Sequence, residues 1–391
     1  MIVSPGCLMH APTIVTLKIT LFAAVCATIL FSFTAPYLSS GNVSDPIPNW
    51  HLRPTQEERP SLPILKSYGA SHCLSDVTDE LVAESRAWNA SCGKFAPHAP
   101  TRSRIGRVLL QYGEMKEYIK RALKTHVVHS MIHQTDLHIL CDAMAEEWDL
   151  WNKPAFILRM LLEQMTLPPD DRVEWLLWMD LDTLILDQCR PMSSFLPPEN
   201  VEELVHTAEA ARRLAKREDE KDTVGHDDSS PSPINLITTK DASGLNNGIF
   251  LLRVSPWAVE LFENILAYRF YNPNITLIFN DQSAMEFILA TPKFASNVVY
   301  TPWHWFNAYP NSEAGPERFR DRENGDTEEL KEFQVRRGDS LVHFAGPWFK
   351  DEPMTAWEDV VEGMGNVWEE GRVQRDISKE VKKFWEEKGF N

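Results

Sequence analysis

Two carboxylates separated by one residue follow an apolar stretch near the middle of the chain. Asp180 and Asp182 come directly after Trp175–Met179. A short, continuous apolar run bounded by polar residues is typical of a strand that is buried on both faces of a parallel sheet. Ligands of open α/β sheets bind outside the carboxyl ends of the strands. We therefore expect Asp180 and Asp182 to hold a hard divalent cation that neutralises a phosphate group.

A histidine at the end of a second apolar stretch is a candidate third ligand. His343 lies in the apolar segment 340–346 and is followed by the small residues Ala345 and Gly346. The carboxyl ends of parallel strands meet at one edge of a sheet, so its distance from Asp182 in sequence is no obstacle. An imidazole added to two carboxylates favours Mn²⁺ over Mg²⁺. Taken by itself, such a residue is more often a buried core or turn histidine than a metal ligand.

Alternating strands and helices place these residues in an α/β fold. The order predicts a mostly parallel sheet with right-handed crossovers, the nucleotide-binding half of a doubly wound fold. Glycines flank Asn247, so residues 244–248 are expected to form a turn before a buried strand. Strands are expected at 107–113, 136–141, 175–179, 234–238, 249–253 and 340–346, and helices at 115–129, 151–165, 257–268, from Asp281 onward and beyond Trp357.

The amino-terminal quarter of the chain differs in composition from the rest. Residues 14–33 form an apolar run long enough to cross a bilayer, interrupted only by Lys18. We interpret residues 1–13 as a cytosolic tail, 14–35 as an uncleaved signal-anchor transmembrane helix and 36–100 as a Pro- and Ser-rich lumenal stem. Residues 101–391 then form the catalytic domain. A charged surface insertion is expected within it at 202–233.

Acceptor triplets and cysteines agree with a lumenal location. Asn42, Asn89 and Asn274 each begin an Asn-x-Ser/Thr triplet for N-glycosylation. The four cysteines beyond the apolar run permit two disulfides. A pair between Cys73 and Cys92 is preferred because these residues flank a short stem segment, and free buried thiols are the alternative.

Composition limits the kind of partner. The chain has 391 residues, 43% of them hydrophobic and 24% charged, which describes an ordinary globular protein. Its formal net charge of -17 argues against a nucleic-acid partner, which would require clustered Lys and Arg. The 13 Trp suit stacking on sugars or nucleotides, although most are expected in the core.

Six motifs in this order resemble a known family. Between Arg104 and Glu358 the chain is similar to the fungal α-1,2-galactosyltransferase and α-1,6-mannosyltransferase family, to which plant xyloglucan xylosyltransferases are related. The motifs begin at Trp151 (WNKPAF), Glu174 (EWLLWMDLDT), Gly244 (GLNNGIFLLR), Asp281 (DQSAME), His304 (HWFNAY) and Leu341 (LVHFAG).

The resemblance implies a retaining glycosyltransferase of the GT-A fold with type II Golgi membrane topology. The donor would be UDP-galactose or GDP-mannose, and the acceptor a glycan. Retention is expected to proceed by same-face attack, although a covalent intermediate on Asp281 is also compatible with the sequence. The implied roles are as follows: Asp180, Asp182 and His343 bind the metal, Asp180 and Lys153 contact the nucleotide, Asn247 and Gly248 line the donor-sugar pocket, and Asp281 and Gln282 lie near the reacting carbon.

Two other classes of protein fit parts of the pattern. Asp180-Leu-Asp182-Thr183 also matches the nucleophile loop of haloacid dehalogenase-like phosphatases, with Asp180 as the nucleophile. That loop normally follows the first strand of its domain, whereas here at least two expected strands come earlier. The second alternative is a non-catalytic subunit of a glycosyltransferase complex.

Overall fold

The protein is described by a computed structural model covering residues 63–98, 103–111, 113–144, 150–168, 171–198, 234–311, 315–346 and 349–390. The expected cytosolic tail, the signal anchor, the acceptor triplet at Asn42 and the charged insertion at 202–233 lie outside these residues. Within the described residues, the helices are all too short or too polar to span a bilayer.

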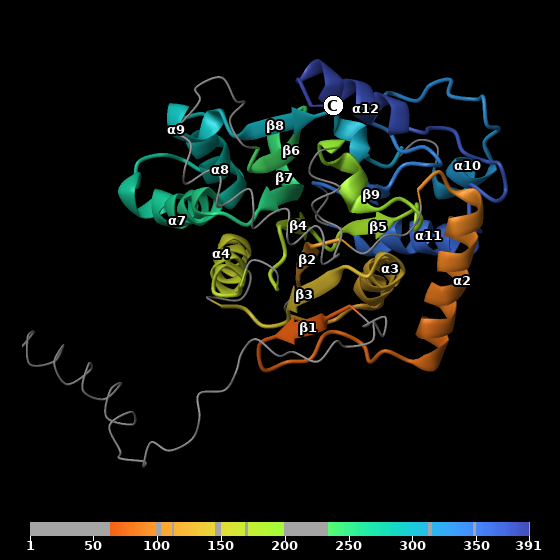
Figure 1. Ribbon diagram of the computed structural model, residues 1–391, viewed down its shortest axis with the longest axis horizontal. Coiled ribbons are helices and arrows are strands. Elements are labelled where there is room, and N and C mark those ends of the chain that lie inside the picture. The colour runs from red at the N-terminus through yellow and green to blue at the C-terminus, as the bar shows by residue number, and fades with distance from the viewer. Residues whose placement is uncertain are drawn as a thin grey trace, which may run out of the picture. The chain divides into compact units, whose positions relative to one another are not determined.

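A mixed, mostly parallel sheet forms the centre of the fold (Figure 1). In the described part of the chain it has seven strands, and the pairs β1–β3, β3–β2, β2–β4 and β6–β8 are parallel. Only β7 runs antiparallel, against both β4 and β6. The order across the sheet is β1 (Leu65–Tyr68), β3 (Asp136–Leu140), β2 (Ile105–Leu110), β4 (Trp175–Met179), β7 (Gly244–Arg253), β6 (Leu236–Asp241) and β8 (Val298–Thr301).

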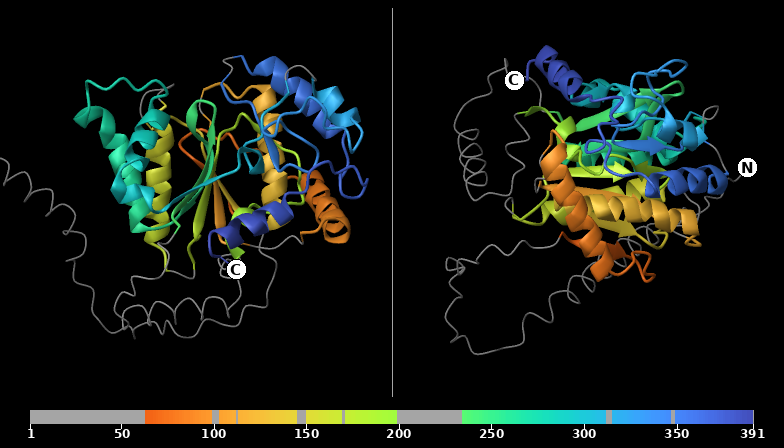
Figure 2. Two further views of the ribbon diagram at one scale, coloured as in Figure 1. Left: turned by 90° about the horizontal axis from the view of Figure 1, so that it is seen from above. Right: turned by 90° about the vertical axis from the view of Figure 1, so that its right-hand side faces the viewer.

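Helices cover both faces of this sheet, as the left view of Figure 2 shows. One layer consists of α4 (Asn152–Met165), α7 (Pro256–Tyr271), α8 (Asp281–Leu289) and α9 (Pro292–Ala295). The other side carries α2 (Asp79–Phe95), α3 (Glu117–His133), α10 (Gly315–Asp321), α11 (Asp351–Glu362) and α12 (Ser378–Glu387). Two short 3₁₀ helices, η2 (Met192–Phe195) and η3 (Trp303–Trp305), lie in the connections.

Strand β4 shows why the apolar run in the sequence is continuous. Trp175 and Leu177 pack into the core beneath α3, whereas Leu176 and Trp178 pack beneath α4 and α7. Successive side chains of a strand point to opposite faces, so a strand covered on both sides needs apolar residues at every position. The expected strand at 175–179 is therefore confirmed.

Two expectations about local structure are wrong. Residues 244–248 form no turn; they are the first half of the long strand β7, and the turn lies before Gly244, whose φ is +113°. His343 is not at the edge of the main sheet either. It lies in β9 (Leu341–His343), which pairs antiparallel with β5 (Thr183–Ile185) in a separate two-stranded sheet. The β5–β9 pairing, rather than convergence of parallel strands, brings His343 opposite Thr183.

The expected stem reaches too far along the chain. Residues from Leu65 onward belong to the folded unit, because β1 extends the sheet beside β3 and α2 packs against α3. The short helix that the sequence allows near Asp76–Trp88 corresponds to α2, whereas β1 has only four residues and no apolar pattern marks it. In this helix Asn89 is exposed, and so is Asn274 after α7.

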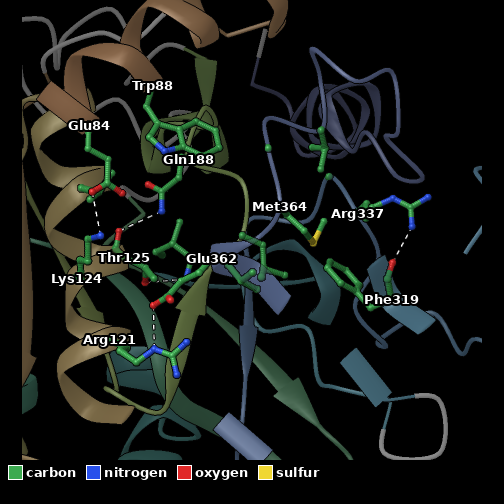
Figure 3. A pocket seen from close by; sticks show the side chains of 17 residues that line it. Glu84, Trp88, Arg121, Lys124, Thr125, Gln188, Phe319, Arg337, Glu362 and Met364 are labelled. Carbon is green, nitrogen blue, oxygen red and sulfur yellow. Dashed lines mark hydrogen bonds and ion pairs between the residues drawn. The ribbon is translucent and has the colours of Figure 1, made fainter. Parts of the chain in front are cut away.

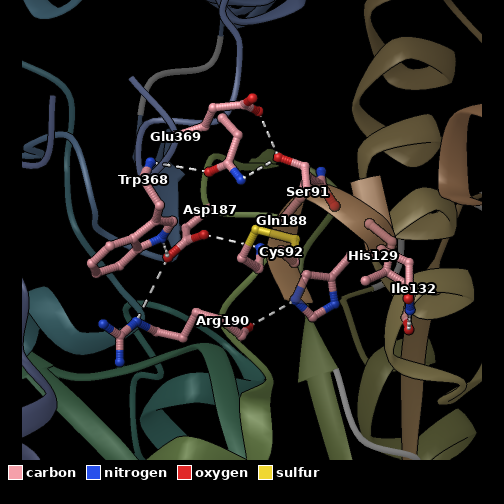
Figure 4. Close-up of a disulfide and its surroundings, with 12 residues drawn as sticks. Ser91, Cys92, His129, Ile132, Asp187, Gln188, Arg190, Trp368 and Glu369 are labelled. Atoms are coloured by element: carbon pink, nitrogen blue, oxygen red, sulfur yellow. Dashed lines mark hydrogen bonds and ion pairs between the residues drawn. A yellow bond between two sulfur atoms is a disulfide. The ribbon is translucent and has the colours of Figure 1, made fainter. Parts of the chain in front are cut away.

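The disulfides join the amino-terminal elements to the sheet. Two bonds form, as the cysteine count allows, but the preferred Cys73–Cys92 pair is wrong. Cys73 bonds to Cys141 and Cys92 bonds to Cys189. Cys92 near the end of α2 faces the segment after β5, where Cys189 lies between the chain neighbours Gln188 and Arg190 (Figure 4). Proximity in sequence was misleading, because the fold brings distant segments together.

Candidate active site

The two carboxylates lie where β4 leaves the sheet. The backbone N–H of Asp180 donates to Gly248 O at 2.8 Å, which extends the β4–β7 ladder by one bond. Phe344 N–H donates to Asp182 O at 2.9 Å and so attaches the end of β9. Asp180 and Asp182 are therefore held by backbone bonds to two different strands. Their side chains face a cavity at this edge of the sheet.

Asp180, Asp182 and His343 form a cluster with the ligand set expected of a divalent-cation site. One ligand atom from each residue lies within 4.8 Å of the others. His343 Nε2 is 3.4 Å from Asp182 Oδ1, and Lys350 forms an ion pair with the other oxygen, Asp182 Oδ2. Burial alone would raise the pKa of Asp182, but the positive charge of His343 in its protonated form and that of Lys350 outweigh this effect and hold the pKa of Asp182 well below the usual range. Asp182 is therefore ionised at neutral pH, as a metal ligand must be.

A hydrogen bond to Asn307 fixes the orientation of the His343 imidazole, on the side of the ring opposite Asp182. Its Nδ1 lies 2.5 Å from Asn307 Oδ1, and Asn307 Nδ2 donates to Thr239 Oγ1 at 2.9 Å. Because the amide oxygen of Asn307 accepts, the proton of a neutral His343 is on Nδ1 and the Nε2 lone pair faces Asp182. A Cβ on Gly248 would lie 2.4 Å from His343 Cε1, so only glycine allows the imidazole this position. Two carboxylates and an imidazole with its lone pair directed inward fit Mn²⁺.

A lysine connects the first carboxylate to the residues expected around the donor sugar. Lys153, in the first turn of α4, places Nζ 3.0 Å from Asp180 Oδ1, 2.7 Å from Asn247 O and 3.1 Å from Asn247 Oδ1. Asn247 Nδ2 donates to Asp281 Oδ2 at 2.9 Å, and its backbone N–H donates to Gln282 Oε1 at 3.1 Å. One hydrogen-bond network thus joins five of the expected site residues: Lys153, Asp180, Asn247, Asp281 and Gln282.

Asp281 is a buried carboxyl whose pKa is raised above the usual range of aspartate. Burial raises its pKa to about 6, and Asp180 adds to the effect, whereas Lys153 and the hydrogen bond from Asn247 oppose it. The preceding residue, Asn280, has a φ of +46°, a conformation that non-glycine residues rarely adopt. Buried carboxyls with raised pKa values and unusual backbone geometry are found preferentially at functional sites.

The network opens into a cavity of about 580 Å³, a volume within the usual range of small-molecule binding sites. Several lining residues carry no role in the sequence-based account. Lys350 is one, seven residues after His343. Tyr309 is another: its hydroxyl donates to Asp241 Oδ2 at 2.7 Å and accepts from Asn246 Nδ2 at 2.7 Å. Tyr309 ends the motif that begins at His304, and its place in that motif was the available signal.

A second cavity, of about 160 Å³, lies between α2, α3 and α11 (Figure 3). Four of its charged lining residues form ion pairs with one another: Arg121 Nε is 2.9 Å from Glu362, and Lys124 is 2.9 Å from Glu84. Arg337 donates to Phe319 O at 2.7 Å. Six of the eight site residues expected from the sequence line the larger cavity instead, so we place the active site there.

The sequence belongs to a family of sugar-transferring enzymes. The model of the galactosyl transferase GMA12/MNN10 family matches residues 108–353, and the chain is a member of that family. This match confirms both the resemblance seen in the six motifs and the enzyme class, glycosyltransferase.

Two fungal proteins are similar over part of their length. An uncharacterized alpha-1,2-galactosyltransferase of Schizosaccharomyces pombe is 25% identical over 235 residues, which cover 58% of this chain and 60% of that protein. A probable alpha-1,6-mannosyltransferase, MNN10 of Saccharomyces cerevisiae, is 27% identical over 148 residues, covering 35% of this chain and 34% of that protein. The chain thus matches less than two thirds of the length of either relative.

Solved structures of glycosyltransferases show a weaker likeness. One is a glycosyltransferase involved in the glycosylation of the major capsid of PBCV-1, with 16% identity and a TM-score of 0.41, covering 66% of this chain and 99% of that chain. Another is the glycosyltransferase GlyE of Streptococcus pneumoniae TIGR4, with 12% identity and a TM-score of 0.34, covering 85% of this chain and 65% of that chain.

Proposed function

We propose that this protein is a retaining, Mn²⁺-dependent glycosyltransferase of the GT-A fold that moves a hexose from a nucleotide sugar to a glycan. The observation that carries the proposal is the cluster of Asp180, Asp182 and His343 beside the network of Lys153, Asn247 and Asp281, within a chain that belongs to a glycosyltransferase family. The hexose is galactose or mannose, in agreement with the names of the two fungal relatives.

The metal ligands and two lysines are suited to hold a diphosphate. A bound Mn²⁺ would act as a Lewis acid that stabilises the leaving diphosphate. Lys153 and Lys350 place ammonium groups next to Asp180 and Asp182, in the cavity. Both are cations with freely rotating donors, so they can contact phosphate oxygens once a cation neutralises the two carboxylates. This arrangement concentrates positive charge where the leaving group develops negative charge.

Asp281 and Asn247 are placed to act on the sugar. Asp281 is held by Asn247 at the cavity wall, with Gln282 beside it. Ionised Asp281 would stabilise positive charge that develops at the reacting carbon during same-face attack, while a departing phosphate oxygen accepts the acceptor's proton. The raised pKa of Asp281 suits this role, because positive charge that develops on the sugar would stabilise the ionised carboxylate.

The cellular setting is part of the same proposal. We place the protein in the Golgi membrane as a single-pass type II protein, with residues 14–35 as the anchor and the catalytic domain in the lumen. This setting is supported by the apolar run, by the acceptor triplets and by the two disulfides, which are typical of oxidising compartments. Association with other glycosyltransferases in a complex is compatible with it.

The phosphatase interpretation of Asp180 is disfavoured. The chain belongs to a glycosyltransferase family, and Asp180 accepts hydrogen bonds on Oδ1 from both Lys153 and Trp178, at 3.0 and 2.7 Å. These donors stabilise the carboxylate and reduce its nucleophilicity, whereas a phosphatase nucleophile must attack phosphorus.

A donor screen tests the proposal. Full-length protein is incubated with Mn²⁺ and each of a panel of nucleotide sugars, and its melting temperature is measured, because a ligand that binds only the folded state stabilises it by about 2.7 kcal/mol at a hundred times its Kd. We expect stabilisation by UDP-galactose or GDP-mannose, lost with EDTA, and transfer of that sugar to an oligosaccharide. Mg²⁺-dependent hydrolysis of an aryl phosphate would support the phosphatase instead, and donor binding without transfer would support a non-catalytic subunit.

A further inference from the structure

Helix α3 presents three buried histidines to the segment that follows the two carboxylates. His126, His129 and His133 are three to seven residues apart and therefore share one face of the helix. Each Nε2 is within hydrogen-bond distance of a backbone carbonyl oxygen. The pairs are His126 with Thr183 O at 3.2 Å, His129 with Arg190 O at 2.9 Å, and His133 with Gln188 O at 3.0 Å.

Arg107 determines which ring nitrogen carries the proton in two of these histidines. Its side chain is only 1% exposed, at the centre of β2. Nη1 lies 3.0 Å from His126 Nδ1, and Nη2 lies 2.8 Å from His129 Nδ1. A guanidinium group donates and never accepts, so both Nδ1 atoms must be unprotonated acceptors. The proton of each ring is then on Nε2, where it is donated to the carbonyl oxygen opposite.

Electrostatics keep these rings neutral. Burial, followed by the charge of Arg107, lowers the pKa of His126 to about 3. Burial, then His133 and Arg107, hold the pKa of His129 well below its usual range. Burial also lowers the pKa of Arg107, to about 9, so the guanidinium is still charged at neutral pH. Across the physiological pH range, Arg107 therefore donates to both Nδ1 atoms, and both Nε2 atoms donate to the carbonyl oxygens opposite.

Thr183 connects His126 to the backbone of Asp180 by hydrogen bonds. His126 Nε2 also lies 3.1 Å from Thr183 Oγ1, and that hydroxyl donates to Asp180 O at 2.6 Å. Thr183 directly follows Asp182 in sequence and pairs with His343 across β5 and β9. A chain of hydrogen bonds thus runs from Arg107 through His126 and Thr183 to the backbone of Asp180, behind all three expected metal ligands.

We propose that Arg107, His126 and Thr183 are positioning residues that fix the Asp180–Asp182 backbone and thereby set the affinity of the site for a divalent cation. The inference rests on the proposed metal-dependent function. The residues lie behind the ligands rather than in the cavity, so they act on the metal site through its backbone. The segment after Thr183 is further restrained by the Cys92–Cys189 disulfide, beside which His129 lies (Figure 4).

The sharpest test compares two substitutions of one residue. Thr183→Val keeps the branched shape but removes the hydroxyl, whereas Thr183→Ser keeps the hydroxyl. Mn²⁺ binding to full-length protein is measured by calorimetry in the absence of any nucleotide, and folding is checked by circular dichroism and melting temperature. We expect Thr183→Val to bind Mn²⁺ about 10-fold more weakly, in the range typical of groups that orient metal ligands, and Thr183→Ser to bind close to wild type.

A second pair of substitutions tests the role of His126. His126→Gln retains a donor and an acceptor, and His126→Leu removes both. We expect the Gln variant to bind Mn²⁺ more tightly than the Leu variant; if His126→Leu does not fold, the Thr183 pair decides. The matched control is His138→Gln, because His138 is another buried histidine, hydrogen-bonded to Tyr68 Oη at 3.1 Å on the far side of β3. Its Mn²⁺ affinity should equal that of wild type.

The outcomes separate this inference from the proposed function. Folded Thr183→Val that binds Mn²⁺ as tightly as wild type would overturn the positioning role and leave the metal site standing. Wild-type protein that binds no Mn²⁺ would overturn the metal site, and the positioning role with it. An equal loss of affinity in His138→Gln would show a general effect of core substitution and would also contradict the inference.

Discussion

His343 Nε2 faces Asp182 Oδ1 at 3.4 Å, and the opposite ring nitrogen is held 2.5 Å from Asn307 Oδ1. With its proton on Nδ1, His343 directs a lone pair at a carboxylate oxygen. Two lone pairs at this separation repel each other unless a proton or a cation lies between them. A cation bound between His343 Nε2 and Asp182 Oδ1 would therefore relieve this repulsion.

Asn307→Ala should weaken Mn²⁺ binding by about 10- to 100-fold, because the imidazole loses the acceptor that fixes its tautomer and its orientation. Calorimetry with Mn²⁺ measures the effect. Asn264→Ala, an exposed substitution on α7, is the matched control and should leave the affinity unchanged. Equal Mn²⁺ affinities of Asn307→Ala and wild type would exclude His343 as an oriented ligand.

Lys153→Met should lower the affinity for the nucleoside diphosphate of the donor by about 10- to 100-fold, the range for losing a hydrogen bond to a charged group. Methionine retains most of the side-chain length while removing the ammonium group that joins Asp180 to Asn247. Binding is measured by calorimetry with saturating Mn²⁺. Lys293→Met, exposed on α9, is the control. A folded Lys153→Met variant with unchanged affinity would remove Lys153 from the binding site.

The activity should fall as the pH drops through about 6, because burial raises the pKa of Asp281 to that value and its ionised form is the active one. The acid limb of kcat/KM reports this group in the free enzyme. A limb unchanged in the residual activity of Asp281→Asn would assign the titration to another group.

The same pKa gives a stability prediction with a definite sign. A raised pKa means that the folded state favours protonated Asp281, so this stabilisation is present below the ordinary aspartate range and is lost as the pH rises through about 6. Asp281→Asn mimics the protonated form and should melt at a higher temperature than wild type at pH 7, with the difference narrowing as the pH falls and closing below the ordinary aspartate range. A lower melting temperature at pH 7 would show that the carboxylate stabilises the fold.

The fold brings the expected site residues close together, and several of them lie on or directly after strands with strong local signals. The apolar run before Asp180 and the glycine-flanked Asn247 each lie on one continuous element. His343 was expected for a partly incorrect reason, since β9 belongs to a separate sheet. Asn307 and Tyr309 lie in the motif that begins at His304, but local patterns do not show which residues they contact. Lys350 lies outside the six motifs and reaches the site only through tertiary contacts.

The wrong predictions, of the disulfide pairing and of the extent of the stem, concern contacts between residues far apart in the sequence. Cys73 and Cys92 were paired as near neighbours, but the folded chain places them against Cys141 and Cys189, which are 68 and 97 residues away. The edge strand β1 is too short to show an alternating pattern, and its stability comes from hydrogen bonds to β3. The composition of this region resembles a linker, although it is part of the sheet.

Removal of the Cys92–Cys189 bond by the double substitution to Ala should lower the free energy of unfolding by about 2–4 kcal/mol, since the bond closes a long loop in the unfolded chain. Guanidinium titration measures the change. The corresponding Cys73–Cys141 double variant is the comparison, with a somewhat shorter loop of 68 residues. Peptide mapping without reduction must find both bonds, and an unchanged midpoint would contradict their stabilising role.

We propose that the cluster of Asp180, Asp182 and His343 binds the cation on which sugar transfer depends. The most direct test is Mn²⁺-dependent transfer from UDP-galactose or GDP-mannose by full-length Asp182→Asn, assayed together with Mn²⁺ binding and melting temperature. We predict a folded protein that has lost both Mn²⁺ binding and transfer, whereas the wild type shows both and loses transfer with EDTA. Wild-type Mn²⁺ affinity and transfer rates in Asp182→Asn would contradict the claim.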